Sequence, residues 1–189
     1  MIDKMKNYQD IQIKPNSEFS QNFLLSKVYF NFHKALIDNK PLNVGVSFPN
    51  YRLTLGNTIR LHSNKTDLLK LNNYNWLGDL NTFCHVAEID LIPVSGIKYR
   101  TVSRWQSNMG KSKLKRLLKR GSITEEDVRK YKSMMFKKQL TNLPYLDMKS
   151  LSNGQWYRRY FKMGTIADIP SLGEFDNFGL SKKATIPWF

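Results

Sequence analysis

The first hundred residues alternate between short apolar strands and amphipathic helices. Residues 8–14 alternate polar and apolar side chains, as a half-buried strand does, with Ile11 and Ile13 on one face. Ser20 is a suitable N-cap for a helix that ends near Asn39. Apolar residues recur along this helix at helical spacing: Leu24, Val28, Phe32, Ala35 and Leu36.

The same alternation continues to about residue 97. Residues 43–48 and 58–62 predict two short strands, residues 64–71 predict a second helix, and residues 86–94 predict a final strand. The resulting order, β-α-β-β-α-β, is that of the split βαβ or ferredoxin-like fold, in the α+β class. We therefore predict a ferredoxin-like domain over residues 1–97, with one sheet face that is free to meet RNA.

The pattern changes at Lys98, where basic residues become frequent. Residues 113–120 predict a short helix ended by Gly121, and Thr124 with Asp127 resembles a capping box for a second helix to about Gln139. Beyond Pro144 the sequence predicts a polar turn and a strand over residues 155–163. We predict a smaller C-terminal α/β RNA-binding domain over residues 98–189.

The distribution of charge indicates which class of partner the chain binds. The 189 residues carry 30 Lys+Arg and 15 Asp+Glu, a formal net charge of +15. Residues 98–139 hold 14 basic and 3 acidic side chains, so most of the excess lies in this segment. Such a concentration favours nucleic acid as the partner over a merely solvated face.

The predicted basic helix is amphipathic. Leu114, Leu117 and Leu118 form one narrow apolar stripe. The opposite arc holds Lys113, Lys115, Arg116, Lys119 and Arg120, which either grip phosphates without sequence preference or enter a groove. Upstream, Arg104 and Gln106 are suited to bidentate recognition of guanine and adenine edges.

The candidate chemistry is RNA cleavage without a metal ion. The carboxylates are scattered rather than clustered, which disfavours a metal-dependent nuclease. A general base could instead activate a ribose 2′-hydroxyl, and the candidates are His33, His62 and His85. A histidine in each of these settings is more often structural or on the surface than catalytic. Ser150 and Ser152 either form an ordinary turn or fix the 2′-oxygen, and the residues alone leave both interpretations open.

Several classes are excluded or disfavoured by composition. No apolar run approaches the length of a membrane span, and the N-terminal residues lack the apolar segment of a signal peptide. Cys84 is the single cysteine and the histidines lack zinc-ligand spacing, so we expect a cytoplasmic protein with no structural metal and no cofactor.

Seven short motifs in order resemble one known family over nearly the whole chain: DIQIKP, FHKAL, VGVSFP, YRTVSRWQ, the Lys/Arg helix, the SxSNGQ turn and the terminal GLSKKATIPWF. This family is the repeat-processing endoribonuclease of type I-F CRISPR systems, the Csy-type endonuclease. The resemblance implies binding of the repeat stem-loop in precursor RNA and metal-independent cleavage at the 3′ base of the stem, leaving a 2′,3′-cyclic phosphate. It also implies one-to-one retention of the mature guide RNA within a surveillance complex of other subunits.

The resemblance assigns roles to individual residues. It implies that His33 is the acid/base residue, that Ser150 holds the 2′-hydroxyl with Ser152 nearby, and that Tyr157 stacks on the terminal base pair. It implies base reading by Arg104 and Gln106 and groove insertion by the helix that carries Arg116 and Arg120. The family often has a tyrosine where this chain has Phe178, which cannot donate a hydrogen bond. That departure keeps open a non-cleaving hairpin-binding subunit, and the charge alone also fits a general basic RNA- or DNA-binding protein.

Overall fold

The computed structural model describes residues 5–107, 109–139 and 142–189, and it is a mixed α+β fold with several antiparallel sheets. The chain forms two compact units. The main unit combines the chain up to Arg104 with Pro144–Phe189, and the helical unit is Trp105–Leu143. Within the main unit, strands after residue 97 pack with the N-terminal elements.

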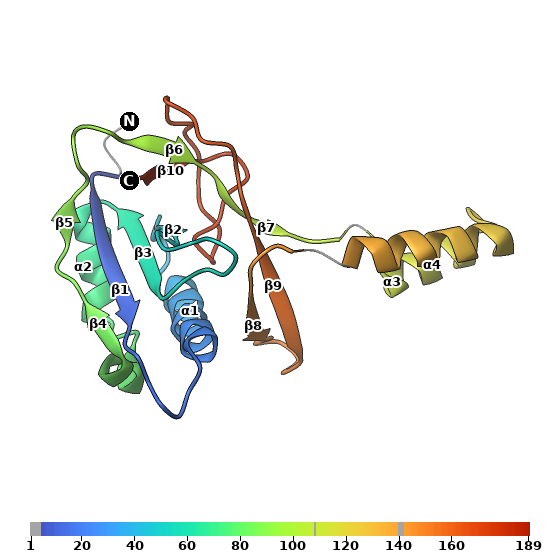
Figure 1. The fold of residues 1–189 in the computed structure, drawn as a ribbon, viewed down its shortest axis with the longest axis horizontal. Coiled ribbons are helices and arrows are strands. Elements are labelled where there is room, and N and C mark those ends of the chain that lie inside the picture. Colours follow the sequence, from blue (N-terminus) through green and yellow to red (C-terminus); the bar gives the residue numbers. More distant parts are fainter. Residues whose placement is uncertain (1–4, 108, 140–141) are drawn as a thin grey trace. The chain divides into compact units, whose positions relative to one another are not determined.

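A five-stranded antiparallel sheet organises the first half of the main unit (Figure 1). Its strands follow the order β2-β3-β1-β4, and β5 also pairs with β1. The elements are β1 (Asn7–Ile13), α1 (Gln21–Asp38), β2 (Gly45–Ser47), β3 (Thr58–Ser63), α2 (Lys65–Asn73), the 3₁₀ helix η2 (Gly78–Phe83), β4 (Cys84–Val86) and β5 (Asp90–Leu91).

The predicted alternation sets the register and the core of this sheet. Ile11 lies opposite Ile59 on β3, and both side chains are fully buried. Helices α1 and α2 both pack on β1 and β3. Ser20 and Asn64 cap these two helices, each accepting a hydrogen bond from a backbone N–H of the first turn. The predicted β-α-β-β-α-β order is therefore present.

The predicted strand over residues 86–94 is wrong in its extent. Two short strands replace it, and both pair with β1: β4 lies opposite residues 11–13, and β5 lies opposite Asn7 and Tyr8. Between them the backbone carbonyl of Ala87 accepts a hydrogen bond from the Gln9 side chain. The Ala87 N–H donates to the Asp10 carbonyl in the same gap, so the segment between the two strands also stays attached to β1.

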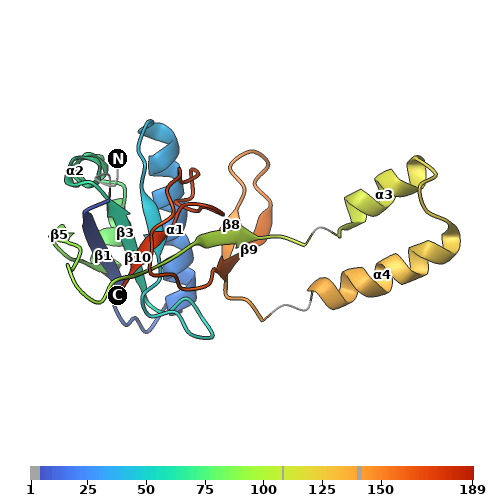
Figure 2. The same cartoon turned by 90° about the horizontal axis from the view of Figure 1, so that it is seen from above.

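Five further strands complete the main unit: β6 (Lys98–Arg100), β7 (Val102–Trp105), β8 (Tyr145–Lys149), β9 (Trp156–Met163) and β10 (Ile186–Trp188). β10 pairs with β6, while β7, β9 and β8 form a three-stranded sheet in that order. β8 packs along α1, and Figures 1 and 2 show the β8–β9 hairpin beside this helix. This packing brings residues from distant parts of the sequence next to α1.

The helical unit contains α3 (Lys111–Lys119) and α4 (Glu125–Gln139). Gly121 follows α3 with a φ of 64°, the left-handed conformation expected of a glycine that ends a helix. Thr124 and Asp127 make the predicted capping box, since each side chain accepts a hydrogen bond from the other residue's backbone N–H. No helix in the described parts of the chain is long and apolar enough to cross a membrane.

Candidate active site

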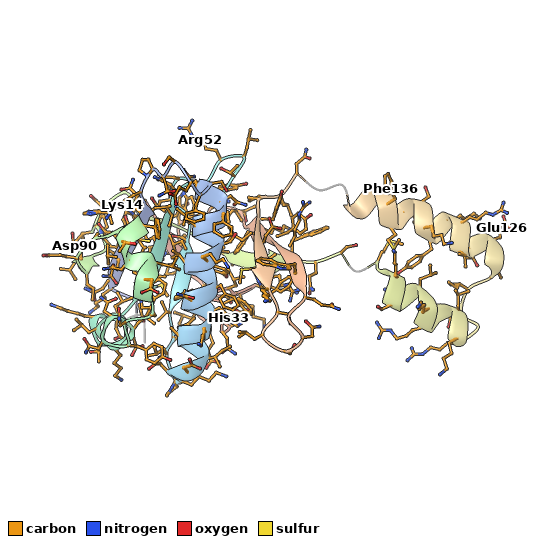
Figure 3. The ribbon with its side chains drawn as sticks, turned by 90° about the horizontal axis from the view of Figure 1, so that it is seen from below. Lys14, His33, Arg52, Asp90, Glu126 and Phe136 are labelled. Carbon is orange, nitrogen blue, oxygen red and sulfur yellow. The ribbon has the colours of Figure 1, made fainter. Side chains whose placement is uncertain are left out.

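His33 lies in the second half of α1, within the main unit (Figure 3). In the structure the residue is only 9% exposed, because the C-terminal segment around Phe178 covers its ring. The imidazole is therefore held between α1 and a segment almost 150 residues later in the sequence.

One hydrogen bond defines the tautomer of His33. Its Nδ1 lies 2.7 Å from the backbone carbonyl oxygen of Asn177. A carbonyl oxygen only accepts hydrogen bonds, so Nδ1 must carry the proton. In the neutral ring the lone pair is then on Nε2, which is the arrangement that a general base requires.

A tight turn holds the Asn177 carbonyl in place. The Asp176 Oδ1 accepts hydrogen bonds from the backbone N–H groups of Phe178 at 2.8 Å and Leu180 at 3.0 Å. Gly179 has a φ of 69°, and a Cβ at this position would lie 3.1 Å from Phe32 and from a backbone oxygen of Val44. The glycine thus allows both the left-handed turn and its close approach to α1.

Phe178 is sandwiched between two charged or chargeable groups. The His33 ring stacks on it with centroids 3.4 Å apart and planes 14° from parallel. The Arg159 guanidinium carbon lies 3.4 Å from the same centroid. Two groups at this contact distance cannot share one face, so His33 and Arg159 occupy opposite faces of the phenyl ring.

This environment lowers the pKa of His33 below the ordinary value of 6.5. Burial is the largest cause, and the nearby Arg159 cation acts in the same direction. The Asn177 carbonyl and the Asp176 carboxylate partly oppose both effects. His33 is therefore neutral at pH values at which an ordinary histidine is substantially protonated.

Arg104 on β7 belongs to the same electrostatic environment. Burial is the main cause of a lowered pKa for Arg104, and repulsion from Arg159 adds to it. The Nε atoms of both arginines are buried and have no hydrogen-bond partner among the described residues. Arg159 does donate from Nη2 to the Tyr157 hydroxyl at 3.1 Å. Arg104 and Tyr157, predicted from the sequence, thus share their surroundings with Arg159, which was not.

Ser150 and Ser152 lie in the turn that joins β8 to β9. Their hydroxyl oxygens are 3.1 Å apart, and the Ser150 backbone N–H donates to the Gln155 carbonyl at 2.9 Å. Gly154, with a φ of 68°, completes the turn. Within the described residues no hydrogen bond joins either hydroxyl to His33, although β8 packs along α1.

The remaining predicted RNA-binding residues lie in the helical unit. Gln106 is exposed. Leu114 is buried and Leu117 half-buried, but Leu118 is 43% exposed, so the predicted apolar stripe is only partly covered. The predicted cations are all exposed: Lys113, Lys115, Arg116 and Lys119 lie in α3, and Arg120 is its C-cap residue.

The other two histidines have different surroundings. His62 is fully buried, its Nε2 lies 2.8 Å from the Ser47 hydroxyl, and burial lowers its pKa to about 3. His85 is exposed on β4. Among the described residues, no three His, Cys, Asp or Glu side chains lie close enough together to hold a metal ion.

Sequence reasoning missed Arg159, Asp176 and Asn177. In β9 the two neighbouring arginines, Arg158 and Arg159, face opposite sides of the strand, and the sequence does not say which one is buried. Asn177 contributes a backbone carbonyl, which any residue type provides. The one available signal was the alternation of Tyr157, Arg159 and Phe161 on one face of the strand.

Comparison with known proteins places these residues in context. Residues 8–189 match the model of the family described as CRISPR-associated protein (Cas_Csy4). The chain is 35% identical over 187 residues to the CRISPR-associated endonuclease Cas6/Csy4 of Escherichia coli (strain UTI89 / UPEC), covering 98% of this chain and all of that protein. It is 33% identical over 189 residues to the protein of the same name from Pseudomonas aeruginosa (strain UCBPP-PA14), again covering 98% of this chain and all of the relative. The chain thus belongs to the Cas6/Csy4 family of CRISPR-associated endonucleases.

Proposed function

We propose that this protein is an endoribonuclease that binds the stem-loop of a CRISPR repeat in precursor RNA and cuts at the 3′ base of the stem. Family membership supports the substrate class, since the relatives are named CRISPR-associated endonucleases. The observation that carries the chemistry is the hydrogen bond from His33 Nδ1 to the Asn177 carbonyl, which leaves Nε2 as a base.

The proposed reaction is attack of a ribose 2′-hydroxyl on the adjacent phosphate. His33 Nε2 takes the proton of the 2′-hydroxyl, the 2′-oxygen forms a bond to phosphorus, and the bond from phosphorus to the 5′-oxygen breaks. The 5′-oxygen takes a proton from water, and His33 later returns its own proton to solvent. The products are a 2′,3′-cyclic phosphate and a 5′-hydroxyl, and no step of this scheme requires a metal ion or cofactor.

Ser150 is proposed to hold the 2′-hydroxyl for in-line attack, with Ser152 supporting it. The hydroxyl pair in the β8–β9 turn supports this role because each serine oxygen both donates and accepts. Phe178 shapes the pocket rather than moving a proton, since its ring carries no hydroxyl. Proton transfer therefore rests on His33.

RNA recognition is proposed to involve both units. Arg104 and Gln106 read base edges near the foot of the stem, and Tyr157 stacks on the terminal base pair. Helix α3 approaches a groove with its exposed cations. The strand order β2-β3-β1-β4 supports a ferredoxin-like arrangement up to about residue 97, with residues 98–189 supplying most RNA contacts.

We infer that one protein molecule binds one hairpin in the cytoplasm, where precursor RNA is transcribed. The protein then remains on the mature guide RNA as part of a type I-F surveillance complex with other subunits. Retention follows if product and substrate share the same stem, because the contacts proposed for binding are to the stem and not to the severed strand.

The test is cleavage of a hairpin from the repeat array that neighbours the gene, in EDTA. We expect His33→Ala to lower the cleavage rate by roughly 10²- to 10⁴-fold, the usual contribution of a general base. Hairpin affinity should stay within about twofold, because the proposed binding contacts do not involve the imidazole.

His85→Ala is the matched control, because it removes an exposed histidine from the same unit. Parental cleavage by His33→Ala would contradict the assignment. If the parental protein binds the hairpin tightly but never cuts it, the chain is instead a non-cleaving hairpin-binding subunit.

A further inference from the structure

The Arg159 side chain occupies an unusual place for an arginine. It is 2% exposed, and its guanidinium stacks on Phe178. None of the salt bridges found between the described residues involves it. Its one side-chain hydrogen bond in that part of the chain is the donation to the Tyr157 hydroxyl. Such a cation carries a desolvation cost that no bound carboxylate offsets.

The position of Arg159 relative to His33 suggests why the chain buries a cation here despite its desolvation cost. The phenyl ring of Phe178 separates the guanidinium from the imidazole, with 3.4 Å to the ring centroid on each side. The cation contacts the electron-rich face of the ring, which is a favourable cation–π arrangement. The imidazole stacks on the other face of the same ring.

We propose that Arg159 is a positioning residue for His33, which clamps Phe178 flat against the imidazole and fixes a positive charge behind the ring. This inference rests on the proposed role of His33 as the base. It adds a residue, Arg159, to which the sequence reasoning assigned no part in the site.

The clamp has two consequences for His33. The planar contact between Phe178 and His33 holds the imidazole so that Nδ1 donates to the Asn177 carbonyl and Nε2 keeps one direction. The charge of Arg159 disfavours the imidazolium form of His33, because two cations would then face each other across one phenyl ring in a partly buried site. Arg159 therefore helps to keep the base neutral and aimed.

The other charged and titratable groups near His33 bear on its protonation in known directions. Asp176, in the turn that packs on α1, favours the imidazolium form. Arg104 on β7 interacts electrostatically with both Asp176 and Arg159, so it adds a second cation to this group of charges. Tyr29, one turn before His33 on α1, is a neutral hydroxyl at working pH, since burial raises its pKa well above 10. The Tyr157 hydroxyl on β9 accepts a hydrogen bond from Arg159.

The experiment measures the pKa of His33 directly, by NMR of the labelled imidazole in the full-length protein without RNA. We expect Arg159→Met, which keeps the length and removes the charge, to raise the pKa of His33. Arg159→Lys keeps the charge and should hold the midpoint close to the parental value. Asp176→Asn keeps the acceptor oxygen of the turn and should move the midpoint in the opposite direction.

Cleavage kinetics provide the second readout. In Arg159→Met the acidic limb of the plot of kcat against pH should move to higher pH, by the same amount as the pKa of His33 measured by NMR. At high pH, where the base is fully neutral, kcat should still be reduced by roughly ten- to a hundredfold, since misplacing a catalytic group by about 1 Å has such an effect. Affinity for a non-cleavable hairpin should change by less than about twofold.

Arg158→Met is the matched control, because Arg158 is the adjacent residue on the opposite, exposed face of β9, where it pairs with Asp147. It should leave the His33 midpoint at the parental value. Thermal melting of each variant separates folding defects from the titration.

Three results would overturn the proposal. The first is an unchanged His33 midpoint in a folded Arg159→Met variant, and the second is an equal shift in Arg158→Met. The third is a loss of hairpin affinity with no change in the midpoint, which would make Arg159 an RNA contact. If the midpoint moves as expected while the parental protein cuts no hairpin, the proposed function fails and the Arg159–His33 coupling stands.

Discussion

The buried histidines of the main unit, His33 and His62, differ in what their ring nitrogens contact. His33 donates from Nδ1 to a backbone carbonyl and keeps 9% of its surface exposed. His62 is fully covered and contacts the Ser47 hydroxyl. The first arrangement leaves the Nε2 lone pair of the neutral imidazole available, whereas the second is a structural contact between β2 and β3.

His62 should make folding sensitive to acid. Its pKa of about 3 in the folded protein lies well below the ordinary 6.5, so the unfolded chain binds a proton between these values and the folded chain does not. The free energy of unfolding should therefore fall as pH drops from 6.5 toward 3. Between pH 6.5 and 4.5 this one residue should contribute a loss of about 2 kcal/mol.

Urea denaturation of His62→Gln at several pH values tests this expectation, since glutamine does not titrate. The slope of unfolding free energy against pH should be shallower in the variant than in the parent. His85→Gln, at an exposed position, is the control and should keep the parental slope. A parental slope in His62→Gln would show that His62 is not the residue responsible.

How much of the site was predictable differs from residue to residue. His33 was reachable as one of three candidate histidines, and the family resemblance selected it. Arg159 was not, because a pair of adjacent arginines in a strand does not reveal which member is buried. The Asn177 carbonyl could not be predicted either, because every residue type has a backbone carbonyl.

Elements with strong local signals were predicted well. Helices α1, α2, α3 and α4 have apolar periodicity or capping residues that the structure bears out at Ser20, Gly121 and Thr124. The short strands β6, β7, β8 and β10 were missed, because each is stabilised by pairing with a distant partner rather than by its own pattern.

Helix α3 should contribute electrostatic binding energy to RNA. Arg116 and Arg120 are exposed and one turn apart. Replacing both by Gln should weaken hairpin binding and reduce the slope of log affinity against log salt concentration by roughly one for each phosphate that the variant no longer neutralises. Titrations at several salt concentrations would measure both quantities.

The double variant Lys65→Gln/Lys70→Gln on α2 is the matched control, since it removes the same charge from exposed positions of the main unit. It should have a smaller effect on affinity and slope. Equal effects of the two double variants would show that only net charge matters, as expected of a general basic nucleic-acid-binding protein.

At the scale of the whole molecule, charge and chemistry are divided between the two compact units. The helical unit, Trp105–Leu143, carries 11 basic and 3 acidic residues, more than half of the net charge of +15. The candidate base, its carbonyl partner and the Phe178–Arg159 stack all belong to the main unit. This division explains why composition pointed to a polyanion but could not locate the chemistry.

The most direct test of the account uses one hairpin RNA with a single 2′-deoxy nucleotide at the cleavage position. A hairpin with the 2′-deoxy substitution one nucleotide away serves as the control, and both reactions contain EDTA. The account predicts no scission of the first RNA, normal scission of the second, and a 2′,3′-cyclic phosphate on the product. Scission of the first RNA at the normal position would contradict attack by the 2′-hydroxyl and, with it, the role assigned to His33.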